Sequence, residues 1–352
     1  MYIEFFILKS GLHLQGERTI SGIYHLLKGK KSIQSIHDAR MFQIEKVYGL
    51  YPNLHKEFFD KKVKELNKNE LISFETNSEE IFRLTNAGKQ WLNQHDNIIP
   101  YSYFNGLKYS SISPIFYERL LLLIQTLTNS NKKNFSFIPI VDKVAVTSWV
   151  KNYYRKTKRD NQTLLHHLYH DISSILQQIK PTEAAIFVDR LTGYKYYGMS
   201  IDQLANKYSL EPEDIRLLLV GIIHQMLQRI DNNKDNYRIL PLLLTDLSGN
   251  HLITNTAKRT KQLLDRNYSI DHIARIRGLK ENTIQDHIVE IALYDTDFPI
   301  YNYVDKKVEK EIVAAITQLK SFKLREIKHA VHENISYFQI RLVLSQTEYQ
   351  LK

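Results

Sequence analysis

The side chains best suited to chemistry lie in a basic and aromatic run near the middle of the chain. Residues 111–160 hold nine Lys or Arg against three Asp or Glu, whereas residues 161–250 hold eight against ten. Basic groups neutralise phosphates and release counterions, and tyrosine rings stack on exposed bases. The run therefore predicts contact with nucleic acid, in a forked or single-stranded form. The predicted contacts are Lys151, Tyr153, Tyr154, Arg155, Lys156, Lys158 and Arg159. The alternative is that the tyrosines belong to the core and the charges only solvate a helix end.

A second set of basic residues lies in the first 97 residues. It comprises Lys56, Lys61, Lys62 and Lys64, on or beside a predicted recognition helix, and Arg83, on a predicted β-wing. Recognition helices enter the major groove or straddle phosphates. Carboxylates are interspersed along this helix, so a salt-bridged surface or a partner interface is the alternative.

A third set follows a predicted turn near the C-terminus. It comprises Lys280, Asn282, Thr283, Gln285 and His287, whose side chains can hydrogen-bond base edges or phosphates. Carboxylates at Glu281, Asp286 and Glu290 oppose a phosphate surface, so a protein-binding role is the alternative here.

Signatures of catalysis and of metal binding are missing from the sequence. It holds no Gly-x-Gly-x-x-Gly, no Gly-x-Ser-x-Gly and no His-Glu-x-x-His. It also holds no cysteine, which excludes disulfides, thiol nucleophiles and cysteine zinc sites. His166 and His170 stand one helical turn apart, but the apolar residues between them define a different face. We therefore expect a protein that is not an enzyme and that uses no cofactor or metal.

The first 97 residues have the element order of a winged helix. Apolar spacing predicts helices over 21–27, 32–48 and 54–66, strands over 71–75 and 81–85, and a closing helix over 87–93. The run from Phe82 to Gly88, Phe-Arg-Leu-Thr-Asn-Ala-Gly, resembles the end of the wing in many bacterial winged-helix proteins. Alternation along a strand places Phe82 and Leu84 toward the core and Arg83 toward solvent.

The middle of the chain is predicted to be helical after a linker over residues 98–114. Helices are expected over 115–127, 142–156, 161–178, 183–191, 200–207 and 212–228. The last two resemble the helix-turn-helix of sigma-factor region 4. The matching residues are Ile201, Leu204, Ala205, Leu210, Ile215 and Leu218. Ser209 stands in the turn where glycine is usual.

Residues 269–288 carry the clearest helix-turn-helix pattern, with Ala274, Gly278 and Ile284 at its key positions. Gly278 permits the positive φ that a tight turn requires. The region from Thr254 to Leu344 resembles the helix-turn-helix domain at the C-terminus of some RecQ-type DNA helicases. Together with residues 16–31, it makes the whole chain similar to the YpbB-like helix-turn-helix proteins of low-GC Gram-positive bacteria, which are encoded beside a RecQ-family helicase.

The fold class predicted from these patterns is mainly α with a small β-hairpin wing. The expected division is an N-terminal winged helix over 1–97, a linker over 98–114, a helical domain with a sigma-region-4-like helix-turn-helix over 115–250, and a RecQ-helicase-type helix-turn-helix domain over 251–352. The longest apolar run, residues 217–223, is much shorter than the 20 or so residues that span a bilayer. We therefore expect no membrane contact and a cytoplasmic, nucleoid-associated location.

The family resemblance implies an accessory protein of DNA repair or recombination. Its expected partners are a RecQ-type DNA helicase and DNA, which basic helix-turn-helix surfaces would contact. Two alternatives stay open. One is a transcriptional regulator that reads a duplex operator as a dimer, and the other is a protein-binding scaffold without DNA contact.

Overall fold

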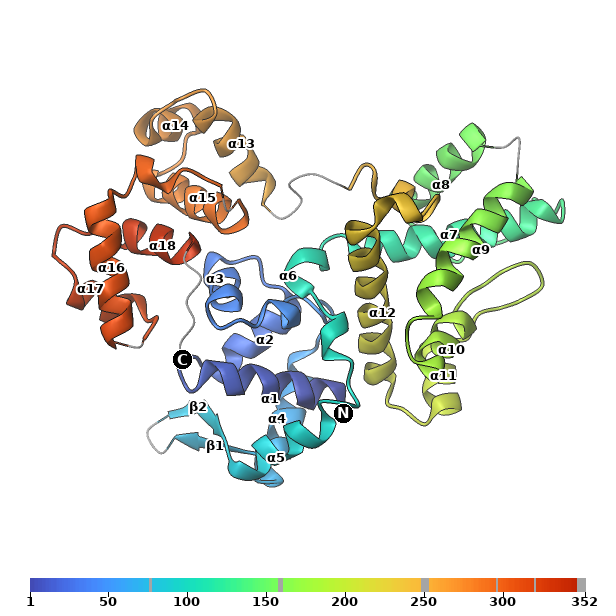
Figure 1. Ribbon diagram of the computed structural model, residues 1–352, viewed down its shortest axis with the longest axis horizontal. Coiled ribbons are helices and arrows are strands. Elements are labelled where there is room, and N and C mark those ends of the chain that lie inside the picture. The colour runs from blue at the N-terminus through green and yellow to red at the C-terminus, as the bar shows by residue number, and fades with distance from the viewer. Residues whose placement is uncertain (76–77, 158–160, 248–252, 296, 320, 347–352) are drawn as a thin grey trace. The chain divides into compact units, whose positions relative to one another are not determined.

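The computed structural model describes residues 1–75, 78–157, 161–247, 253–295, 297–319 and 321–346. In this part of the chain, helices dominate and the β-structure is a two-stranded antiparallel hairpin (Figure 1), which confirms the predicted fold class. The chain divides into two compact units. The first contains Met1–Phe6 and Leu92–Gly249, and the second contains Ile7–Trp91 and Asn250–Lys352. The two ends of the sequence therefore share a unit. We call residues 7–91 the N-terminal module and residues 250–352 the C-terminal module.

The first 97 residues form α1 (Tyr2–Leu14), α2 (Ile20–Lys28), α3 (Ile33–Met41), the 3-10 helix η1 (Glu45–Val47), α4 (Lys56–Lys68), β1 (Ile72–Glu75), β2 (Ser78–Leu84) and α5 (Asn86–His95). Helix α1 was not predicted because it is apolar on most of its sides, so that Phe5, Phe6 and Ile7 are all buried. The helix predicted over 32–48 was too long. It ends at Met41, and Gln43 then takes a positive φ of 54°.

The wing follows the predicted alternation. Strands β1 and β2 pair antiparallel, with Ser73 opposite Arg83 and Phe74 opposite Phe82. Phe82 is buried at 1% exposure and Arg83 is exposed. An isolated antiparallel bridge also joins Thr19, just before α2, to Ile81 of β2.

The C-terminal module is built from α13 (Asn255–Leu264), α14 (Ile270–Arg277), α15 (Glu281–Tyr294), the 3-10 helix η5 (Ile300–Asn302), α16 (Lys306–Leu319), α17 (Leu324–Ala330) and α18 (Tyr337–Gln346). Helix α15 is the centre of this module, because α13, α14 and α18 all pack against it. Its buried residues Ile284, Ile288 and Ile291 have no exposed surface.

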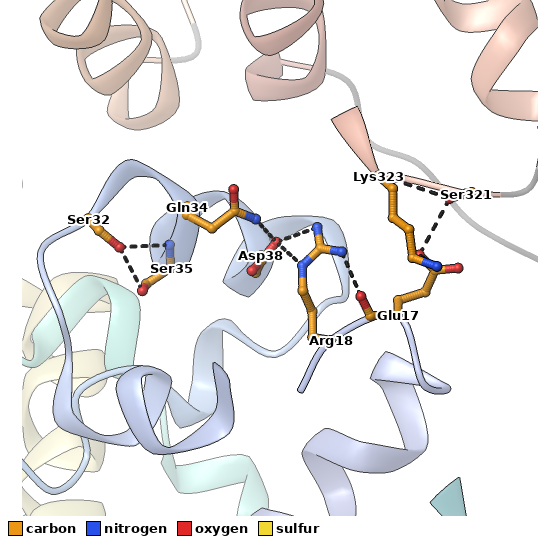
Figure 2. Close-up of polar contacts among 8 residues, drawn as sticks. All are labelled: Glu17, Arg18, Ser32, Gln34, Ser35, Asp38, Ser321 and Lys323. Atoms are coloured by element: carbon orange, nitrogen blue, oxygen red, sulfur yellow. Dashed lines mark hydrogen bonds and ion pairs between the residues drawn. The ribbon is translucent and has the colours of Figure 1, made fainter. Parts of the chain in front are cut away.

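The N-terminal module packs on the C-terminal module through α3, which lies against α15 and α18. Phe42 and Phe322 meet edge to face, with ring centroids 5.7 Å apart. Glu17 accepts a hydrogen bond from Ser321 at 3.4 Å and lies 3.9 Å from the ammonium of Lys323 (Figure 2). His37 of α3 is buried, and burial, helped by nearby positive charges, lowers its pKa to about 3. This joint makes one folded body from two ends of the sequence.

The first unit contains η2 (Tyr101–Tyr103), α6 (Gly106–Tyr109), α7 (Ser113–Asn131), α8 (Val144–Thr157), α9 (Asn161–Leu176), α10 (Pro181–Asp189), α11 (Ile201–Tyr208), α12 (Pro212–Asn232), η3 (Lys234–Asn236) and η4 (Leu240–Leu244). The segment predicted as a linker, 98–114, instead carries short helices and buries Phe104 and Tyr109 at 1% exposure each. Its aromatic residues pack against α12, which explains why its lack of periodicity did not mean an exposed loop.

Candidate nucleic-acid interface

The turn between α14 and α15 has the geometry of a helix-turn-helix. Ala274 and Ile284 are buried, and Gly278 adopts the left-handed conformation with φ 62°. The amide of Leu279 then donates to the carbonyl oxygen of Ala274 at 3.0 Å, which ends α14 with a tight reversal. A Cβ at Gly278 would meet nothing within 4 Å, so glycine is needed there for its backbone conformation and not for space.

A polar cluster joins the three helices of this domain behind the turn. Arg277 of α14 donates to the carbonyl oxygen and to the hydroxyl of Thr256, both at 2.8 Å, and it also bonds the hydroxyl of Thr260. Thr260 and Thr256 in turn contact the two ring nitrogens of His287 at 2.9 and 3.1 Å. His287 is only 6% exposed, and burial followed by the charge of Arg277 lowers its pKa. Its ring is thus occupied inside the domain and does not reach the surface where a base would lie.

The acidic residues of α15 are used within the domain. Glu290 is buried and accepts hydrogen bonds from the amide and the hydroxyl of Thr254, the N-cap of α13. Asp286 pairs with Arg341 of α18 at 2.7 Å. Of the three carboxylates expected to repel a phosphate, Asp286 and Glu290 are therefore bonded to neighbouring side chains or backbone. Only Glu281 of these three is exposed on the first turn of α15.

Only the beginning of α15 is accessible. Lys280, Glu281 and Asn282 are exposed and Thr283, Gln285 and Asp286 are half-buried, whereas residues 287–293 are all buried. Recognition helices contact base edges with their N-terminal residues. Four of the predicted contacts in this region lie on this accessible end of the helix: Lys280, Asn282, Thr283 and Gln285. The fifth, His287, is buried and cannot contact DNA from this position.

The predicted winged-helix contacts are largely paired with carboxylates. Lys56 bonds Asp60, and Lys61 and Lys62 lie 3.9 and 3.6 Å from Glu65. Arg83 donates to Glu75 across the hairpin at 3.0 Å. Lys62 is also buried at 7% exposure, whereas Lys64 is exposed. These pairs favour the salt-bridged alternative for this face over a phosphate contact.

The central basic run lies at the end of α8. Lys151, Arg155 and Lys156 are exposed, which suits a phosphate contact. Tyr153 and Tyr154 are half-buried: the ring of Tyr153 stacks on Trp149 at 5.3 Å and the hydroxyl of Tyr154 accepts from Asn161 at 3.2 Å. The ring of Tyr153 and the hydroxyl of Tyr154 are thus engaged within the unit. Lys158 and Arg159 lie outside the described residues.

The helix-turn-helix of α11 and α12 has the right turn but a buried second helix. Ser209 takes the left-handed conformation with φ 53°, in the place where glycine is usual, and the amide of Leu210 donates to Ala205 at 3.0 Å. Helix α12 is buried along nearly all its length, and its Asp214 accepts from the amide of Tyr2 at 2.8 Å. This helix is the scaffold of the first unit and is poorly placed to enter a groove.

Two kinds of feature are absent from the residues that the structure describes. No three His, Asp or Glu side chains converge among them in a way that could hold a metal ion. None of the helices in this part of the chain is long and apolar enough to cross a bilayer.

Comparison with known proteins agrees with the geometry of the C-terminal module. Residues 256–344 match the family model of a helix-turn-helix domain. The chain is also 28% identical over 346 residues to the protein YpbB of Bacillus subtilis, an alignment that covers 98% of this chain and 97% of that protein. No solved structure matches the chain. The predicted resemblance is thus confirmed: residues 256–344 are a helix-turn-helix domain, a DNA-binding type of fold, in a chain that is similar to YpbB over nearly its whole length.

Proposed function

We propose that this chain is a non-enzymatic accessory protein that contacts DNA through the first turn of α15 and docks on a RecQ-type DNA helicase. The observation that carries the DNA contact is the accessible end of α15, where Lys280, Asn282 and Gln285 gather. Of the nearby carboxylates, Asp286 pairs with Arg341, and Glu290 is buried and hydrogen-bonded to Thr254. The helicase partner is supported by the resemblance of this domain to the C-terminal domain of such helicases. A cytoplasmic, nucleoid-associated location and a role in repair or recombination follow from the proposal.

Binding of the full chain to duplex and forked DNA across salt concentrations tests the DNA contact. Replacing Lys280 by Glu is expected to weaken binding about tenfold, because it removes a phosphate contact and adds a repulsive charge. Lys307→Glu on α16 is the matched control, since it changes the same charge on an exposed residue of the same module. Equal affinity of both variants and the unmodified chain would refute α15 as the contact.

The helicase partnership has a separate test. The full chain should retain its RecQ-type helicase in a pull-down and should do so after nuclease treatment, which removes association bridged by DNA. Failure to retain the helicase under both conditions would remove the partner from the proposal while leaving the DNA contact in place.

A protein-binding scaffold is the second candidate function. It is favoured for the first unit by the burial of α12, which is unsuited to reading a groove. A regulator that reads a duplex operator finds less support, because the paired lysines of α4 leave little free positive charge on the wing side.

A further inference from the structure

The loop between α10 and α11 presents two tyrosines to solvent. Tyr197 is 86% exposed and Tyr196 is 51% exposed, and Lys195, which precedes them, is also exposed. Most tyrosines of folded chains bury part of the ring, because the ring is largely apolar. The sequence run Gly-Tyr-Lys-Tyr-Tyr-Gly, residues 193–198, thus holds two of its rings outward at a cost in solvation.

This loop is nevertheless tightly built. Gly193 and Tyr196 exchange backbone hydrogen bonds at 2.9 and 3.3 Å, and Lys195 turns the corner with φ 56°. The amide of Gly198 donates to the buried hydroxyl of Thr192 at 3.0 Å. A Cβ at Gly198 would lie 2.2 Å from the carbonyl oxygen of Arg190, so only glycine lets the two strands of the loop come this close. The exposed rings therefore stand on a rigid base.

The loop is fixed to the last turns of α7. The amide of Tyr194 donates to the hydroxyl of Thr128 at 3.2 Å, which fixes the loop between α10 and α11 to the end of that helix. The next residue along α7, Asn129, anchors the segment that follows the helix by accepting from the amide of Asn134 at 3.0 Å. This second segment exposes Lys132, Lys133 and the ring of Phe135, which is 67% exposed.

The charges of the two segments have one sign. Residues 128–141 and 190–201 contain Lys132, Lys133, Arg190 and Lys195 and no Asp or Glu. The carboxylates that flank these segments are Asp142, Asp189 and Asp202, of which Asp189 pairs with Lys207. Segments that carry lysines and exposed aromatic rings and no carboxylate of their own match a polyanion whose flat bases are free to stack. Single-stranded DNA has this chemistry, whereas the bases of a duplex are already stacked.

We propose that Tyr196, Tyr197 and Phe135, with Lys132, Lys133 and Lys195, form a platform for single-stranded DNA in the first unit. The rings stack on successive bases and the lysines neutralise the phosphates between them. This platform supplies the aromatic contacts for which Tyr153 and Tyr154 are too buried. The platform does not depend on the DNA contact proposed for α15.

Fluorescence anisotropy of a labelled oligothymidine of about 20 nucleotides, titrated with the full chain, tests the platform. The double variant Tyr196→Ala, Tyr197→Ala should bind at least tenfold more weakly, because each stacked base contributes about that factor. Tyr197→Phe should stay within about twofold, because it keeps the ring and loses only the hydroxyl. Tyr169→Ala on α9 is the matched control, since that tyrosine is 70% exposed and lies outside the platform.

Two further measurements test the charge contacts and the stacking separately. Lys132→Glu with Lys133→Glu should lower the slope of log affinity against log salt by about 0.7 for each lysine. In Tyr197→Trp, saturating oligothymidine should quench the emission of the added tryptophan, which reports stacking without relying on affinity.

The proposal is overturned if the double tyrosine variant binds oligothymidine as tightly as the unmodified chain, as it would if this surface docks a protein. It is also overturned if that variant, folded by circular dichroism, loses duplex and single-strand affinity equally. Lys280→Glu distinguishes the two proposals, because it should weaken duplex binding and leave oligothymidine binding unchanged.

Discussion

Arg277 donates a hydrogen bond from Nη1 to Nδ1 of His287 at 3.3 Å, which links the end of the first helix of the C-terminal helix-turn-helix to the second. Because a guanidinium has no acceptor, Nδ1 of His287 must be the unprotonated nitrogen. Its Nε2 then carries the proton and donates to the hydroxyl of Thr256. The cluster holds His287 neutral, and it fixes the crossing of α14 and α15 on which the exposed turn of α15 depends.

Removal of the Arg277 side chain should destabilise the C-terminal module. Arg277→Ala removes the donor that binds the carbonyl oxygen and hydroxyl of Thr256 and the hydroxyl of Thr260, so we expect a loss of about 2 to 3 kcal/mol in the free energy of unfolding by urea. Arg275→Ala is the control: it lies on the same helix, and its side chain is 76% exposed and pairs with Asp271, which implies a change below about 0.5 kcal/mol. Equal losses in both variants would contradict the structural role of Arg277.

Stability should fall as the solution becomes acidic. Burial lowers the pKa of His37 and of His224 to about 3, and burial and Arg277 lower that of His287. These histidines bind fewer protons in the native state than in the unfolded state, where their pKa is about 6.5. Their contribution to stability is therefore complete above pH 6.5 and declines as the pH falls toward the folded-state values.

Urea unfolding between pH 7 and pH 5 measures this decline. Burial raises the pKa of Glu45 and Glu290, which acts in the opposite direction, so the contribution of one histidine is best taken as a difference. His224→Gln should flatten the pH dependence, whereas His272→Gln at an exposed position should leave it unchanged. The role assigned to buried histidine fails if the two variants show the same slope as the unmodified chain.

The left-handed turn residues of the two helix-turn-helix units predict opposite effects of substitution. Gly278→Ala forces a Cβ into the left-handed region and should destabilise the fold by about 1 kcal/mol. Ser209→Gly removes that strain at the corresponding turn and should stabilise the fold by up to about 1 kcal/mol. Thermal unfolding of the two single variants tests both signs, and a shift in the same direction for both would show that backbone strain does not control these turns.

Arg119 is expected to be the most sensitive charged residue of the first unit. It is buried, its guanidinium binds Asp246 at 2.6 and 2.7 Å and the carbonyl oxygen of Leu243 at 2.8 Å, and it lies 4.5 Å above the ring of Trp149. Arg119→Ala should cost about 3 kcal/mol, because it removes a buried guanidinium together with its hydrogen bonds to Asp246 and Leu243 and its contact with Trp149. Arg119→Lys should recover only part of this, since an ammonium cannot bind the carboxylate with two parallel hydrogen bonds. Full recovery by lysine, seen in chemical unfolding, would contradict the importance of the paired geometry.

The joint between the two ends of the chain should make their unfolding cooperative. Phe322 of the C-terminal module has no exposed surface and packs on Phe42 of the N-terminal module. Phe322→Ala should cost about 3 to 5 kcal/mol and should also speed hydrogen exchange of the amides of α3. Phe298→Ala, also buried but stacked on Tyr303 within the C-terminal module, is the comparison. Unchanged exchange in α3 after Phe322→Ala would show that the modules unfold independently.

The sequence by itself determined the local architecture of the helix-turn-helix units. The buried small residue at Ala274, the positive φ at Gly278 and the apolar anchor at Ile284 all depend on neighbours a few residues away, and so does the alternation of Phe82 and Arg83 in the wing. Hydrophobic period and turn chemistry are local properties, which is why these predictions succeed. Whether such a unit can bind DNA depends on whether other segments bury the helix that follows the turn.

Only the tertiary structure decided which charged and aromatic side chains are free. The burial of His287, the pairing of Asp286 with Arg341 and the outward rings of Tyr196 and Tyr197 come from contacts between segments far apart in the chain. The association of residues 7–91 with residues 250–352 also depends on contacts between distant segments. Helix α3 packs against α15 and α18, and the hydrophobic pattern of neither segment predicts this contact. Packing between distant segments leaves no periodic pattern in the local sequence, so it cannot be predicted from such a pattern. The accessible surface consists of the residues that this packing does not bury.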